Sequence, residues 1–114
     1  MAMPLTKRNC KPCRGDVAPL KGSALKEMAA ELSEKWNVVD EHHLTRTYKF
    51  KNWQDAVAFT VRIAALAEKE NHHPDIFLSY GKVEVTVFTH KIGGLSPNDF
   101  ILAAKIEQAS NQAT

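Results

Sequence analysis

The sequence has few cysteines, no long apolar run and almost no surplus of charge of one sign, and each shortage excludes a class of protein. Its 114 residues include only two cysteines, which are too few for a fold built on disulfides. No apolar run approaches the ~18 residues that a membrane helix requires. The formal net charge is +2, with the basic residues interleaved with acids, so we expect neither membrane nor nucleic acid as a partner.

The size and composition describe one globular domain. Hydrophobic residues make up 44% of the chain and charged residues 25%, which are ordinary values for a protein with a packed core. Residues 1–11 lack the apolar stretch of a signal peptide, so we expect a cytoplasmic protein.

Residues 1–22 show no periodicity and contain several prolines and glycines. We expect a flexible N-terminal arm over 1–22 and a single domain over 23–114, and removal of residues 1–20 should leave fold and activity nearly intact. Within the arm, Cys10 and Cys13 have the spacing of a redox pair or of half a zinc site. No second pair completes a zinc site, and redox pairs normally open a helix behind a strand. Two reduced thiols without a metal are therefore the favoured interpretation.

Three segments have the periodicity of amphipathic helices. The first covers about residues 24–35, with Ser23 as its N-cap and apolar residues spaced by three and four. The second begins after the cap residue Asn52 and ends before Pro74, because the residue ahead of a proline resists the helical conformation. The third opens with Ser96 as cap and Pro97 in the first turn, and runs to about residue 109.

Strand-like alternation occupies the segments between these helices. Residues 38–51 contain a first strand, a turn and a second strand, and two more strands cover 76–80 and 83–89. Gly81 and Lys82 between them suit a type II′ hairpin turn. The order α-β-β-α-β-β-α predicts an α+β domain, in which helices cover one face of an antiparallel sheet. Four side chains, those of Val83, Val85, Val87 and Phe88, should be too many for three short helices to cover, so we expect an oligomer.

The residues with useful chemistry gather at the ends of these elements, where loops present side chains to ligands. His72 and His73 follow the second helix, His90 follows the last strand, and Asp99 lies in the first turn of the third helix. Three imidazoles that titrate near neutral pH suit proton transfer in both directions. A shared metal is disfavoured, because adjacent residues such as His72 and His73 point to opposite sides in an extended segment. His42 and His43 are interpreted as ordinary surface residues.

The acids in these segments have simpler interpretations as well. Asp99 would complement the dipole of its helix, and Glu68 would be a solvated surface residue. If Asp99 instead lies against an imidazole, it would fix the tautomer of that ring and raise its basicity.

Four separated blocks together resemble the pterin-4a-carbinolamine dehydratase family. They are the run from Glu68 to Pro74 (EKENHHP), the run from Tyr80 to Val83 (YGKV), the pair Thr89-His90, and the run from Gly93 to Ser96 (GGLS) followed by Asp99. The spacing also fits, with seventeen residues from His73 to His90 and nine from His90 to Asp99. The similarity covers roughly residues 23–110.

The resemblance implies a four-stranded antiparallel sheet with three helices on one face, assembled as a homodimer or homotetramer. It implies His72, His73 and His90 as catalytic residues, with supporting or substrate-binding roles for Glu68, Asn71, Pro74, Thr89 and Asp99. It implies no metal and no cofactor. Many members have a tryptophan two residues after the proline, where this chain has Ile76, so an aromatic wall of the pterin pocket is expected to be missing.

The implied reaction removes water from a 4a-hydroxytetrahydropterin, giving a quinonoid dihydropterin. One group must protonate the leaving hydroxyl and another must take the proton of N5. His72 and His90 are the candidates, in either assignment, while His73 would bind the ring with Glu68 holding its orientation. An aromatic amino-acid hydroxylase, whose pterin the reaction recycles, is the implied metabolic partner. The alternative is a protein-interaction module, a transcriptional coactivator with a vestigial pterin site.

Overall fold

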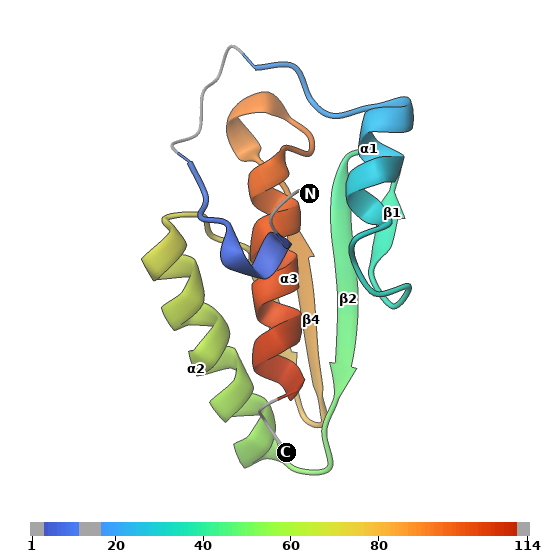
Figure 1. The fold of residues 1–114 in the computed structure, drawn as a ribbon. Helices are drawn as coiled ribbons and strands as arrows, with labels where there is room; N and C mark the ends of the chain where they lie inside the picture. Colours follow the sequence, from blue (N-terminus) through green and yellow to red (C-terminus); the bar gives the residue numbers. More distant parts are fainter. Residues whose placement is uncertain (1–3, 12–16, 112–114) are drawn as a thin grey trace.

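The computed structural model describes residues 4–11 and 17–111. Four strands form one antiparallel sheet in the order β1-β2-β4-β3. Figure 1 shows the helices on one face of this sheet, with α3 lying along β4. The predicted α+β fold and its element order are confirmed; the elements are α1 Gly22–Ala29, β1 Asn37–Val39, β2 His43–Lys49, α2 Trp53–Glu70, β3 Asp75–Ser79, β4 Lys82–Val87 and α3 Pro97–Asn111, with short 3-10 turns η1 Leu5–Lys7 and η2 His90–Ile92.

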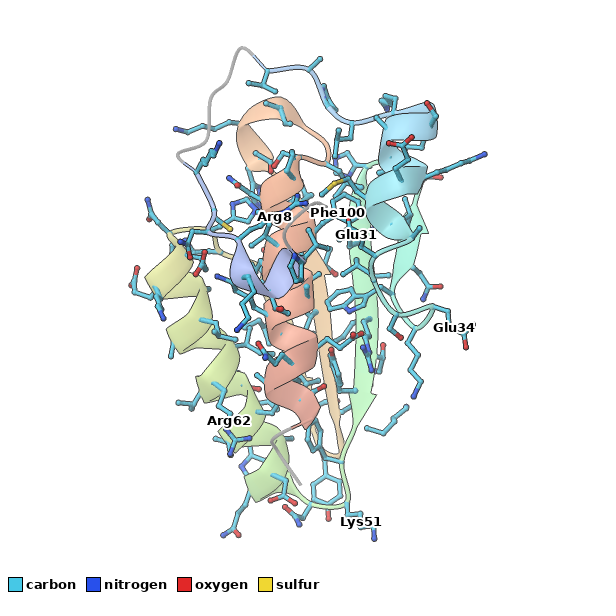
Figure 2. The ribbon with its side chains drawn as sticks, in the orientation of Figure 1. Arg8, Glu31, Glu34, Lys51, Arg62 and Phe100 are labelled. Carbon is cyan, nitrogen blue, oxygen red and sulfur yellow. The ribbon has the colours of Figure 1, made fainter. Side chains whose placement is uncertain are left out.

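The core lies between the sheet and the helices. Strand β4 alternates as a half-buried strand should, and Val83, Val85 and Val87 are each 0% exposed. The prediction that Val83, Val85, Val87 and Phe88 are too many for the helices to cover is therefore wrong for the three valines, while Phe88 is only partly buried. Helix α3 covers the valines because it is apolar on most of its circumference, and its buried residues are Phe100, Ile101, Leu102, Ala103, Ala104 and Ile106. Figure 2 shows Phe100 inside the molecule, whereas Arg62 on α2 points away from it.

Helix α2 begins and ends through specific local interactions. The Asn52 side chain accepts a hydrogen bond from the Asp55 N–H, which confirms the predicted cap. At the other end Asn71 adopts the left-handed conformation with φ of 53°. The N–H of His72 then donates to the carbonyl of Ala67, which is the six-to-one bond of a Schellman motif. This motif reverses the chain immediately before His72.

The first helix differs from its prediction at both ends. Ser23 is not the cap, because the helix already begins at Gly22, whose N–H donates to the carboxylate of Glu41. The helix ends at Ala29 rather than near residue 35. Turns follow it, and in one of them the hydroxyl of Ser33 accepts from the N–H of Lys35, a local bond that competes with continued helix.

The hairpin between β3 and β4 turns one residue earlier than predicted. Ser79 pairs with Lys82, so the two central residues are Tyr80 and Gly81. Only Gly81 has a positive φ, +76°, as at the second central position of a type II turn rather than a type II′ turn. A Cβ at Gly81 would lie 3.2 Å from the Phe50 carbonyl oxygen, so the end of β2 leaves little room for a side chain.

The N-terminal segment has anchors that its sequence did not reveal. Leu5, in η1, is only 4% exposed and belongs to the core, and η1 packs on α3. Further along, the Leu20 N–H donates to the Leu95 carbonyl. We expected a flexible arm over 1–22, but Leu5 and Leu20 attach parts of it to the rest of the domain. The boundary between 1–22 and 23–114 stays a prediction. None of the helices in the described ranges is long and apolar enough to cross a bilayer.

Replacing Leu5 with Ala tests whether this segment stabilises the fold. Truncation of a buried leucine costs about 2–5 kcal/mol, and we expect the lower part of that range because η1 lies at the edge of the core. Lys7→Ala, on an exposed position of the same turn, is the matched control. Urea denaturation measures both, and equal midpoints for Leu5→Ala and Lys7→Ala would show that the segment adds nothing to stability.

Candidate functional site

A buried carboxylate lies at the centre of the candidate site. Asp99, in the first turn of α3, is 0% exposed. Its Oδ1 lies 2.6 Å from His72 Nε2, and its Oδ2 accepts from Thr89 Oγ1 at 2.9 Å and from the Ser96 N–H at 2.8 Å. A buried charge is tolerated only when it is well hydrogen-bonded. Three donors from three different segments meet that requirement here.

The interaction with Asp99 fixes the state of His72. The imidazole is only 5% exposed, and an ionised carboxylate can only accept hydrogen bonds. The ring hydrogen therefore resides on Nε2, which leaves Nδ1 as the acceptor nitrogen of the neutral ring. His72 is thus an imidazole that Asp99 holds in one orientation.

Thr89 joins the loop after β4 to the same carboxylate. It is 3% exposed, its N–H donates to the Gly94 carbonyl, and its hydroxyl lies 2.8 Å from Ser96 Oγ. Because the Thr89 hydroxyl donates to Asp99, it accepts the hydrogen of Ser96. These bonds hold the start of η2, where His90 follows with its side chain exposed to solvent.

His90 is part of a stack of rings that the sequence did not indicate. Its centroid lies 4.1 Å from that of Phe88, whose ring also lies 4.7 Å from that of His42 and 6.5 Å from that of His43. His42 in turn lies near His43, with their Nδ1 atoms 3.1 Å apart. His42 and His43 are partly exposed, and their rings also contact each other and Phe88. The available sequence signal was Phe88 and His90, which flank Thr89.

His73 and Glu68 form the exposed part of the site. His73 Nε2 lies 3.4 Å from Glu68 Oε1, and their side chains are 58% and 80% exposed. An ion pair this exposed adds little to stability. Because both side chains are exposed to solvent, a ligand can reach them. Pro74 is partly buried beside them, and Asn71 serves as the left-handed cap of α2.

The absent tryptophan has a structural counterpart. Ile76 lies in β3 and packs against the core, so it provides no aromatic surface next to the histidines. Phe88 lies next to Thr89 in the sequence, and its ring contacts that of His90. The structure therefore brings His72, Thr89 and Asp99 together directly, with His73 and His90 as their neighbours in sequence.

Cys10 is the cysteine of this pair that the structure describes, and its surroundings disfavour the thiolate. Burial, together with the neighbouring Glu70 carboxylate, raises the pKa of the Cys10 thiol to about 12, whereas reactive or ligating cysteines are thiolates. Cys13 lies outside the described residues. Within 4–11 and 17–111, no group of three His, Cys, Asp or Glu side chains is placed to hold a metal ion.

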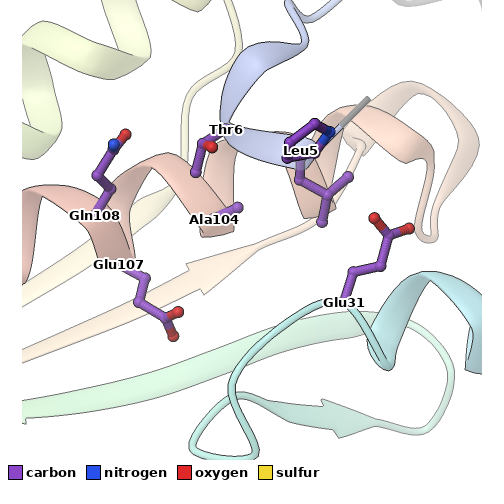
Figure 3. Close-up of a pocket in the computed structure, with 7 residues that line it drawn as sticks. Leu5, Thr6, Glu31, Ala104, Glu107 and Gln108 are labelled. Carbon is purple, nitrogen blue, oxygen red and sulfur yellow. The ribbon is translucent and has the colours of Figure 1, made fainter. Parts of the chain in front are cut away.

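A surface hollow of about 480 Å³ lies away from the histidines, between η1, α3 and the turns after α1 (Figure 3). Its two acids are Glu31 and Glu107, and Glu107 pairs with Arg46 at 2.7 Å. None of the predicted site residues lines it; the lining residues are Pro4, Leu5, Thr6, Glu31, Ala104, Glu107 and Gln108. The chemistry of the site and this hollow are therefore separate features.

Comparison with known proteins assigns the chain to a family. Residues 18–109 match the sequence profile described as Pterin 4 alpha carbinolamine dehydratase. The chain belongs to the pterin-4a-carbinolamine dehydratase family. As a member of this family of hydro-lyases, it is an enzyme. It is 50% identical over 104 residues to a protein of Rubrobacter xylanophilus that is provisionally named pterin-4-alpha-carbinolamine dehydratase, a match that covers 91% of this chain and 96% of the relative.

Two further pterin-4a-carbinolamine dehydratase relatives cover most of the chain. A protein of Alkaliphilus metalliredigens with the same provisional name is 46% identical over 108 residues, covering 95% of this chain and 97% of the relative. The crystal structure of a transcriptional coactivator/pterin dehydratase from Brucella melitensis superposes with a TM-score of 0.73 at 35% identity. That match covers 79% of this chain and 96% of the other.

Asp99→Asn tests the role of the central carboxylate. An amide has one oxygen, so it can accept from His72 or from the pair Thr89 and Ser96, but its NH2 group must then face donors on the other side. We expect a loss of about 1–3 kcal/mol in unfolding free energy, the cost of buried polar groups left unpaired. Denaturant titration near neutral pH measures it. Asp55→Asn, an exposed first-turn acid of α2, is the control, and equal stability of the two variants would contradict this role.

Proposed function

We propose that this enzyme dehydrates a 4a-hydroxytetrahydropterin to a quinonoid dihydropterin by acid–base catalysis with histidines. The observation that carries the proposal is the buried His72–Asp99 pair, flanked in sequence by the exposed imidazoles of His73 and His90. The family membership of the chain supports the substrate class.

The reaction requires two proton transfers and no change of oxidation state. The C4a–O bond breaks as the hydroxyl receives a proton and leaves as water. The N5–H proton is removed, and its electron pair forms the C4a=N5 double bond. A general acid and a general base with pKa values near the working pH suffice for both steps.

The environments of the two imidazoles suggest how they divide this work. The Asp99 carboxylate holds the His72 ring in one orientation, which favours His72 as the base that takes the N5 proton. His90 is exposed, so it can be reprotonated by solvent after it donates to the leaving hydroxyl. His73, next to the Glu68 carboxylate, would bind the pterin ring through hydrogen bonds.

The product implies a metabolic context. A quinonoid dihydropterin must be reduced before a pterin-dependent hydroxylase can use it again. We therefore propose that this enzyme acts in tetrahydrobiopterin recycling and is linked to an aromatic amino-acid hydroxylase. A cytoplasmic location stays a prediction.

The alternative function is an interaction module with a vestigial site. The name of the Brucella melitensis relative includes a coactivator role, but a vestigial site would not need a fully buried carboxylate that three donors hold. The organised site favours the enzyme, and the histidine variants below separate the two.

We also propose that the chain forms a homodimer or homotetramer, partly through α2. Trp53 and Val61 on this helix are 47% and 62% exposed, and with Val57 they lie four residues apart on one side. Exposed apolar stripes of this kind mark association surfaces.

Light scattering at micromolar concentration tests this assembly. The wild type should have the mass of a dimer or tetramer, and Val61→Glu should lower the mass because it places a charge in the apolar stripe. Arg62→Glu, on the adjacent exposed position, should leave the mass unchanged. A monomeric wild type would refute the proposed assembly.

Histidine variants test the catalytic proposal. His72→Ala and His90→Ala each remove one proton-transfer group, so each should lower the dehydration rate about 10²–10⁴-fold. The double variant should lose less than the product of the single losses, because the two groups act as a unit. His73→Ala should mainly raise KM. His43→Ala, outside the proposed machinery, is the control.

The rates are measured above the spontaneous dehydration, with circular dichroism to verify folding. If both His72→Ala and His90→Ala stay folded and retain wild-type rates, the proposed active site is wrong and the interaction module becomes the better explanation.

A further inference from the structure

Two polar side chains bind the N-terminal segment through its backbone. Glu70 Oε1 accepts from the Cys10 N–H at 2.8 Å. The Asn98 amide accepts from the Lys11 N–H at 2.9 Å and donates to the Lys11 carbonyl at 2.7 Å. The Asn98 side chain thus both accepts from and donates to the backbone of Lys11, as a neighbouring strand would. The Lys11 side chain takes no part in these bonds.

The Glu70 carboxylate is charged and nearly buried, which makes its interactions directional. It is 7% exposed and lies 2.8 Å from Lys105 Nζ. Burial alone would raise the pKa of Glu70, but hydrogen bonds from Lys105 and the Cys10 N–H outweigh it and hold the pKa below its ordinary value. The Cys10 N–H, together with Lys105, therefore helps to satisfy a buried charge.

Glu70 and Asn98 lie close in sequence to His72 and Asp99, the hydrogen-bonded pair of the candidate site. Glu70 precedes His72 by two residues at the end of α2, and Asn98 directly precedes Asp99 at the start of α3. The segment thus joins the two helix ends between which the His72–Asp99 hydrogen bond forms. Leu5 anchors it on α3, and Figure 1 shows the segment passing beside both helix ends.

We propose that residues 4–11 hold the ends of α2 and α3 in register, and that Glu70 and Asn98 are positioning residues for His72. The inference rests on the proposed function. Acid–base groups must be held within about 0.5 Å of their productive geometry, and a displacement of 1 Å can cost about 10²-fold in rate. The segment joins the two helix ends through the hydrogen bonds of Cys10 with Glu70 and of Lys11 with Asn98.

The first arm of the test asks whether the segment is released, independently of catalysis. In a Cys13→Ser background, Cys10 is the single thiol, and its rate with an aromatic disulfide reagent reports its burial. Asn98→Ala removes both bonds to Lys11, so Cys10 should react at least about 10-fold faster as its pKa falls toward the ordinary value. Lys11→Ala keeps both backbone bonds and should react as the background does.

The second arm asks whether release disturbs the site. Asn98→Ala should lower kcat about 10-fold with little change in KM, because Asn98 positions His72 without touching the substrate. The pH–rate profile should shift as the His72–Asp99 pair loses alignment. Lys11→Ala should keep the wild-type kcat and pH profile. If Asn98→Ala does not fold, Lys11→Pro removes the same N–H donor without altering α3.

Each outcome decides the inference. Faster thiol reaction together with a lower kcat and a shifted profile supports it. An unchanged kcat and profile in a variant with a released thiol overturns it, and so does a lower kcat with an unchanged thiol rate. A wild type without dehydratase activity would instead refute the proposed function, and with it this inference.

Discussion

The structure of the site depends on the burial of one carboxylate. Asp99 is fully buried, and such a charge is stable only while its donors stay in place. The donors come from the segment after α2, the segment after β4 and the turn before α3. Because each hydrogen bond is strong and directional in a poorly polar interior, the carboxylate requires the connection after α2 and both ends of the connection between β4 and α3 to meet at one point.

Each of these loops is shaped locally so that it can reach Asp99. The left-handed Asn71 and the bond from His72 N–H to Ala67 turn the chain at the end of α2. On the opposite side, paired backbone bonds between Thr89 and Gly94 close the loop that contains His90. At α3 the Asp99 side chain accepts the Ser96 N–H, as the acid of a capping box does. Hydrogen bonds that are common at helix ends thereby build a site that can hold the His72 imidazole in one tautomer.

The element order and the family could be predicted from the sequence, because they depend on repeating patterns and on short runs of residues. Periods of two and near four residues predicted the element order, and the blocks around His72, His90 and Asp99 predicted the family. The alternation of β4 showed which face its valines occupy, but not that α3 is apolar enough to cover them all. The end of α1 and the turn at Gly81 depend on single hydrogen bonds and close approaches, which have no period.

The docking of the N-terminal segment could not be predicted for a related reason. Its anchor is a single leucine in an irregular stretch, and its hydrogen bonds join residues 60 and 87 positions apart. The contact of Phe88 with His42 likewise arises only when β2 and β4 pair. Long-range contacts made by isolated residues leave no pattern in the chain, even when they lie beside the site.

The ring nitrogens of His72 provide the most direct measurement of the central claim. In ¹⁵N-labelled protein near neutral pH, His72 should have its hydrogen on Nε2, with an N–H signal that exchanges slowly with water because Asp99 holds it. Nδ1 should have the shift of an unprotonated acceptor. A hydrogen on Nδ1, or an imidazole signal that averages as an exposed histidine does, would contradict the account.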